Sequence, residues 1–216
     1  GIAQGSVFTV FGTNLGPAAA ATPPAFPLAN TLAGTSMTVT VGGVSLECPM
    51  VVSFSTQASA ILPSDTPLGD GTLRVTRPGG QATVPIKVVA HAPGIFALPQ
   101  NGAGPGVLTN PGFAVNTLAS AAAPGATWDV WVTGIGRIAG NDAAAPPVGN
   151  LPFDVQVFVG GRPAQVLYKG RSGCCAGLDQ IRFVVPQGTV GCYVPIEILV
   201  NGVRSNTVTM SVAASG

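Results

Sequence analysis

The stretch AQGSVFTVFGTNLG, residues 3–16, is the most informative part of this sequence, because APGATWDVWVTGIG repeats its pattern at residues 123–136. In both stretches, a small residue and a glycine precede a strand-like run of alternating side chains, and this run ends on a Thr-x-x-Gly turn. VTVGG at 39–43 is repeated by VFVGG at 157–161, and QASAILP at 57–63 by QIRFVVP at 180–186. Three matches in the same order predict a tandem duplication.

The side-chain pattern within each half has a period of two. Val7, Thr9 and Phe11 alternate with Phe8 and Val10, and TLRVT, VPIKVV, VPIEILV and TVTMSVA are further β-branched runs bounded by turn residues. About seven such runs in each half are typical of an immunoglobulin-like β-sandwich. The sequence therefore predicts an all-β fold of two tandem sandwich domains, 1–90 and 107–216, joined by a connection over 91–106. The Ala/Pro-rich segments 16–28 and 139–152 are expected to be exposed loops.

Charge is scarce in this chain. Charged residues make up 8% of it and the formal net charge is +1, so no electrostatic surface for nucleic acid is expected. No apolar run is long enough to predict membrane insertion. A surface of Ala, Val, Thr, Gly and Pro costs little to bury against another subunit, so copies of the chain itself are the expected partner.

Four cysteines raise the question of a metal site, a redox site or a structural staple. Cys174 and Cys175 are adjacent and the chain has one histidine, which argues against zinc, and no helix is expected that would activate a thiol. We expect a disulfide from Cys192 to Cys175 or Cys174, and we leave a 174/175 bond as an alternative. Cys48 pairs with the remaining cysteine or with another subunit, or it is a buried free thiol. This cysteine use favours an oxidising, extracellular compartment.

Other polar residues give weaker signals. Asp65 and Asp70, in SDTPLGDG, suggest a calcium loop, but a proline/glycine turn explains them better. His91 has no nucleophile motif near it, and Asp179 is expected to cap a turn. The sequence therefore predicts no catalytic residue, no metal and no cofactor.

Aromatic residues offer one possible binding surface. Trp128 and Trp131 should point to opposite faces of their strand, so that one lies in the core and the other is exposed or at an interface. An exposed tryptophan together with Tyr168 or Tyr193 would form a platform for stacking a sugar.

Four stretches resemble a known family: GSVFTVFGTNLGP, TQASAILPSDTPLGDGTLRVT, APGIFA and the region from GRSGCCAGLDQ to TVTMSVA. They are similar to an uncharacterised family of secreted bacterial proteins, of acidobacterial type, with repeats like the IPT/TIG immunoglobulin-fold domain. The resemblance implies export and placement in larger cell-surface proteins, and it transfers no catalytic or ligand residue. Gln57-Ala58-Ser59 departs from the Gln-Ile-Asn type run that is more frequent in the family.

Two hypotheses of function follow. The first is a non-enzymatic extracellular structural protein that self-associates through its immunoglobulin-like domains into a surface layer or filament. The alternative is an adhesion module of a larger secreted protein that binds carbohydrate or a surface partner.

Overall fold

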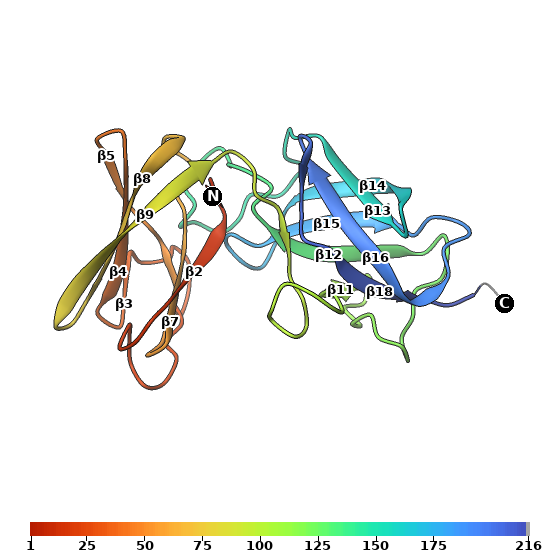
Figure 1. Cartoon of the computed structure of the whole chain (residues 1–216), viewed down its shortest axis with the longest axis horizontal. Helices are drawn as coiled ribbons and strands as arrows, with labels where there is room; N and C mark the ends of the chain where they lie inside the picture. Colours follow the sequence, from red (N-terminus) through yellow and green to blue (C-terminus); the bar gives the residue numbers. More distant parts are fainter. Residues whose placement is uncertain (215–216) are drawn as a thin grey trace. The chain divides into compact units, whose positions relative to one another are not determined.

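The computed structural model describes residues 1–214, and every regular element in that range is a β-strand (Figure 1). The chain is an all-β protein made of two immunoglobulin-like units. Unit 1 comprises residues 1–91, 136–147 and 173–177, and unit 2 comprises residues 92–135, 148–172 and 178 onward. Across residues 1–214 there is no helix with the length and apolar character needed to cross a bilayer.

Unit 1 is a sandwich of two sheets around a core that includes Met37, Met50 and Leu73. In one sheet the order is β1 (Ile2–Ala3), β9 (Gly80–Val89), β8 (Gly69–Arg77), β4 (Thr35–Val41) and β3 (Thr31–Leu32), and β5 (Val44–Glu47) also pairs with β4. The other sheet has the order β2 (Val7–Phe11), β7 (Gln57–Ile61) and β6 (Met50–Ser53).

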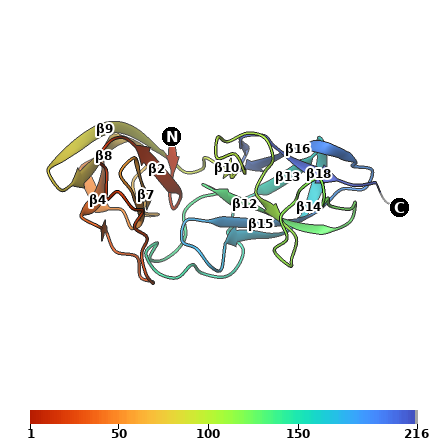
Figure 2. The ribbon, with the colours of Figure 1, turned by 90° about the horizontal axis from the view of Figure 1, so that it is seen from below.

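Unit 2 wraps a continuous network of strands around a core that includes Trp128, Phe183 and Ile198. The order is β10 (Gly94–Ile95), β12 (Thr127–Thr133), β15 (Asp179–Val184), β14 (Arg162–Arg171), β13 (Val155–Val159), β16 (Gly191–Val200) and β17 (Val203–Arg204). In addition, β11 (Leu108–Thr109) pairs with β12 and β18 (Val208–Val212) pairs with β16. Figure 2 shows β12 and β15 side by side.

The strand pairings of unit 1 recur in unit 2. The pairs β2–β7, β4–β8 and β8–β9 correspond to β12–β15, β13–β16 and β16–β18. The repeated VTVGG and VFVGG stretches form equivalent strands, each followed by two glycines with positive φ. Such backbone is favourable for glycine and costly for other residues, which explains why both halves carry Gly-Gly there.

The chain passes from one sheet to the other at different points in the two units. In unit 1 the amide of Cys48 donates to Met37 in one sheet, while the carbonyl of Pro49 accepts from Ile61 in the other. The chain therefore changes sheets between β5 and β6. In unit 2 the same change occurs within β14, which pairs with β13 up to Ala164 and with β15 from Gln165.

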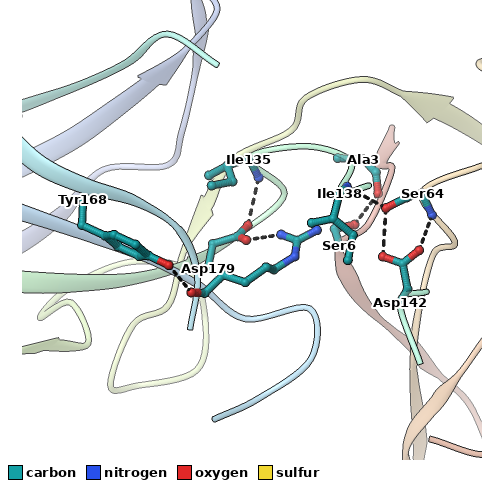
Figure 3. A network of polar contacts seen from close by, with 9 residues as sticks. Ala3, Ser6, Ser64, Ile135, Ile138, Asp142, Tyr168 and Asp179 are labelled. Carbon is teal, nitrogen blue, oxygen red and sulfur yellow. Dashed lines mark hydrogen bonds and ion pairs between the residues drawn. The ribbon is translucent and has the colours of Figure 1, made fainter. Parts of the chain in front are cut away.

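Segments expected to be connections or loops belong to the packed units. Residues 92–106 are part of unit 2, where β10 pairs with β12. Residues 136–147 are part of unit 1. Asp142 in this segment accepts hydrogen bonds from the amide and the hydroxyl of Ser64, at 2.7 and 2.8 Å. The Ser64 hydroxyl in turn accepts a hydrogen bond from the amide of Ile138 (Figure 3).

Candidate functional sites

The outer edge of β9 is an open sheet edge in unit 1. Val88 and Val89 pair there in parallel with β1, and within residues 1–214 the segment 80–86 has no backbone partner other than β8. Residues 80–85 are exposed, and none of them carries a charge. Natural proteins usually blunt such an edge with charge or proline. Here Pro85 is the one such residue in the exposed stretch.

Hydrogen-bond alternation tells which backbone groups of β9 face outward. Pro85 has no N–H and lies opposite Thr72, so this pair must be a non-hydrogen-bonded one whose polar groups point away from the ladder. In an antiparallel ladder the two kinds of pair alternate. Thr83 and Gln81 therefore present their N–H and C=O groups to the outside.

The equivalent edge in unit 2 is covered. Along β18, the amide of Thr209 donates to Gly104 and its carbonyl accepts from Gly106. The side chain of Asn116 bonds both backbone groups of Ser211, at 2.6 and 3.0 Å. Residues 104–122, which run along this strand, leave it no comparable free edge.

Tyr193 is the exposed aromatic residue among the four considered from sequence. Its side chain is 64% exposed. The pairing of β16 with β18 shifts register between Gly191 and Val194, so that Cys192 and Tyr193 form a bulge and are both exposed. Bulges commonly redirect a side chain next to a functional site. The alternating sequence of this strand gave no signal of it.

A hollow of about 320 Å³ lies against Tyr193. It is lined by the turn between β13 and β14, by β14 and β16, and by the turn before β16, through Gly160, Arg162, Gly188, Thr189, Val190, Gly191, Tyr193, Val194 and Pro195. This volume is at the lower end of the range for small-molecule sites.

The hollow has a free positive charge and an unsatisfied hydroxyl. Within residues 1–214 the structure shows no hydrogen bond or ion pair for the exposed side chain of Arg162. Thr189 is 4% exposed, and its Oγ1 is the one buried side-chain polar atom of the described residues without a partner. Burying a hydroxyl without a hydrogen bond costs about 1–3 kcal/mol, so a ligand group that reached it would recover part of that cost.

The other aromatic candidates are not available as a platform. Trp128 is 4% exposed and lies in the core. Trp131, on the opposite face of β12, is half-buried and donates from Nε1 to Thr109 Oγ1 at 3.0 Å. Tyr168 is half-buried and donates its hydroxyl to the carbonyl of Arg171 (Figure 3).

The cysteine pairing differs from the expected one. The disulfide joins Cys174 to Cys175, and Cys192 is an exposed free thiol. The expected bond to Cys192 is wrong because Cys175 precedes β15 and Cys192 follows it. A six-residue strand places its ends roughly 20 Å apart, and the chain then crosses to pair with β13 and β18 instead of returning along β15. Cys174 and Cys175, the adjacent cysteines considered as zinc ligands, are thus joined to each other.

Cys48 is a buried free thiol, the alternative to pairing that the sequence left open. Burial raises the pKa of Cys48 to about 12, which keeps the thiol protonated and unreactive at neutral pH.

The acidic candidates for calcium lie in or near a turn. Thr66 donates its amide and hydroxyl to the carbonyl of Pro63, which forms the turn that contains Asp65. Asp70 is exposed and lies opposite Lys87 in the β8–β9 ladder. Within the described residues no three His, Cys, Asp or Glu side chains come together as a metal site. His91 is half-buried at the end of the first segment of unit 1.

Asp179 takes part in a buried ion pair that the sequence did not indicate. Its carboxylate accepts from the amide of Ile135 at 3.1 Å and pairs with the guanidinium of Arg171, which lies opposite it in the β14–β15 ladder (Figure 3). Burial raises the pKa of Asp179 to about 6, against the opposing effects of Arg171 and the Ile135 amide. Asp179, which the sequence predicted to cap a turn, is one half of a buried charge pair.

No family model matches the chain, and no curated protein matches its sequence. Solved structures with similar folds include a Bacteroides ovatus protein of the mixed-linkage glucan utilization locus, SGBP-B, in complex with a mixed-linkage heptasaccharide. The identity is 14% and the TM-score 0.40, over 99% of this chain and 43% of that one. This chain thus spans less than half the length of that protein.

Two further structures are similar over most of their own length. A tandem pair of titin immunoglobulin domains is 12% identical, with a TM-score of 0.27 over 99% of this chain and 92% of that one. Domains 4 and 5 of the S-layer protein SbsC are 15% identical, with a TM-score of 0.25 over 84% and 77%. No functional assignment follows from similarity at this level.

Proposed function

We propose that this chain is a non-enzymatic extracellular structural protein that associates with copies of itself through the β9 edge of unit 1. The observation that carries the proposal is the uncharged, exposed stretch 80–85, whose outer edge has no partner strand within residues 1–214. An exposed edge of this kind is a template for strand addition. The low charge of the chain, 8%, lowers the cost of desolvating such a contact.

A second copy is the occupant that fits this edge best. Two β9 edges placed antiparallel would exchange hydrogen bonds through Gln81 and Thr83 across a two-fold axis. Pro85 would limit the pairing at one end, because it offers no N–H. A two-fold contact joins only two copies, so a filament or surface layer requires a second contact in addition to this one.

Sedimentation velocity over a range of concentrations tests the proposal. The wild-type chain should form a dimer as concentration rises, and Thr83→Pro should remain monomeric, because it removes an outward N–H without removing a bond to β8. Thr83→Val is the matched control, since it keeps the N–H and should dimerise as wild type. A wild-type chain that stays monomeric at millimolar concentration would contradict the proposal.

Carbohydrate binding is a second candidate function, and the observation that favours it is the exposed Tyr193 beside the hollow of unit 2. A tyrosine ring offers a rigid apolar face with a polar end, which suits a sugar. This candidate concerns unit 2 alone, and it is compatible with association through unit 1.

A further inference from the structure

We propose that the hollow beside Tyr193 binds an acidic saccharide, with Arg162 holding a uronic-acid carboxylate and the Tyr193 ring stacking on the sugar. The inference rests on the second candidate function, carbohydrate binding, and it adds the class of sugar and the residues that recognise it. It does not depend on self-association, since the hollow lies in unit 2 and the β9 edge in unit 1.

The charge of the hollow selects an anion. Arg162 is the one charged residue that lines it. The other three arginines of unit 2 are already paired, with Asp179, Asp129 and Glu197. A guanidinium binds a carboxylate with two parallel hydrogen bonds, a geometry that a lysine or a neutral group does not reproduce.

The aromatic ring selects a ligand with an apolar face. The bulge in β16 exposes Tyr193 beside the hollow, while the adjacent Val194 remains buried in the core. A pyranose ring has one face made mostly of C–H groups, and these groups gain by leaving water against an aromatic ring. The volume of about 320 Å³ suits a single sugar unit with its substituents.

Glycines keep the hollow open. Gly160, Gly188 and Gly191 line it, and all three have positive φ. A Cβ at Gly188 would lie 3.8 Å from Arg162 Cζ, and a Cβ at Gly160 would lie 3.2 Å from Val194 Cγ1. Backbone without side chains there leaves its polar groups accessible to sugar hydroxyls. Thr189, whose buried hydroxyl has no partner among the described residues, belongs to the lining of the same hollow.

A peptide is a poorer fit to this surface. Peptides most often add to a sheet through an open edge. At the hollow, β18 lies along one side of β16, while β13 pairs only with Ile196–Val200 on the other side. The part of β16 without a β13 partner is the short, bulged stretch around Tyr193, which is irregular and offers no extended edge for a peptide strand. The exposed groups are an aromatic ring, a guanidinium and glycine backbone, which suit a compact anionic ring.

Isothermal titration of the whole chain with tri-galacturonate, maltotriose, a sulfated neutral trisaccharide and oligoglutamate tests the proposal. Tri-galacturonate should bind at millimolar concentration or below, and maltotriose should bind about tenfold more weakly. Arg162→Gln should reduce the affinity for tri-galacturonate about tenfold. Arg74→Gln is the matched control, because it removes an exposed guanidinium from unit 1 and should change nothing.

Two tyrosine variants separate binding from folding. Tyr193→Ala should abolish binding of tri-galacturonate, whereas Tyr193→Phe keeps the ring and should bind within a few-fold of wild type. Tryptophan emission checks the fold of both variants, since both tryptophans lie in β12 of unit 2.

Four outcomes would overturn the inference. If maltotriose bound as tightly as tri-galacturonate, the site would not be specific for acidic sugars, but it would still bind carbohydrate. Binding of the sulfated sugar without tri-galacturonate would assign the anion to a sulfate ester. Tighter binding of oligoglutamate would assign the site to an acidic peptide. No binding of any sugar would reject carbohydrate binding as well, without affecting the sedimentation result.

Discussion

Thr9 and Ser59 of unit 1 stand opposite each other in the β2–β7 ladder, as Asp129 and Arg182 do in the equivalent β12–β15 ladder of unit 2. In unit 1 the two hydroxyls share a hydrogen bond of 2.9 Å. In unit 2 the guanidinium binds the carboxylate through two bonds of 2.8 and 2.7 Å. One cross-strand position thus accommodates a neutral pair or an ion pair without a change of topology.

The neighbouring position differs in the same way. In unit 1 the amide of Leu15 donates to the backbone carbonyl of Ser55. In unit 2 the equivalent amide, that of Ile135, donates to the carboxylate of Asp179, which needs Arg171 as a counterion. Three ion pairs lie in unit 2: Arg171 with Asp179, Arg182 with Asp129, and Arg204 with Glu197. At these two equivalent positions unit 2 uses buried carboxylates where unit 1 uses neutral hydrogen bonds, so single substitutions there should affect the two units unequally.

Arg171→Met should give the largest effect. The two side chains are 2% and 0% exposed, so the variant leaves Asp179 buried without its counterion. Removing one member of a buried pair costs about 3–5 kcal/mol. Urea unfolding followed by tryptophan emission measures it, because both tryptophans report on unit 2.

The control for this variant is Arg204→Met, which breaks a partly exposed pair with Glu197 in the same unit. Its cost should be about 0–1 kcal/mol. Equal losses in the two variants would show that burial of the Asp179 pair has no special importance.

Arg182→Ala and Ser59→Ala compare the equivalent positions directly. Arg182→Ala removes the partner of Asp129, which is 1% exposed, and a hydrogen bond to a charged group contributes about 1.5–3 kcal/mol. Ser59→Ala removes a neutral bond that contributes about 1 kcal/mol. Tryptophan emission should show the larger loss of unfolding free energy, in Arg182→Ala. Far-ultraviolet circular dichroism should show the smaller loss, in Ser59→Ala. A larger loss for Ser59→Ala would reverse the comparison.

The sequence predicted the strands better than the contacts around the site. Alternation and the repeat located β2 and β12, and the Gly-Gly stretches marked the turns after β4 and β13, because these features depend on local backbone preferences. The bulge at Tyr193 was missed because the run that follows it still alternates. Arg162 comes near Tyr193 only through the pairing of β13 with both β14 and β16, a long-range arrangement that no local pattern encodes.

The cysteine prediction failed for a related reason. A spacing of 17 residues between Cys175 and Cys192 suits a closed loop only if the chain returns along β15. In the structure it pairs with β13 and β18 instead. Sequence separation alone does not tell which sheet the next strand joins, so the pairing was not predictable from spacing.

The smallest effect is expected at the free thiols, which again contrast the two units. Cys192 is exposed in unit 2, so Cys192→Ser should change the free energy of unfolding by no more than about 0.5 kcal/mol. Iodoacetamide should label the native wild-type chain once, at Cys192, and label Cys48 of unit 1 only after unfolding, because burial raises the pKa of Cys48 to about 12. Mass spectrometry of the labelled chain counts the sites. Native labelling that persists in Cys192→Ser would show that unit 1 opens readily enough to expose Cys48, or that the 174/175 bond is reduced.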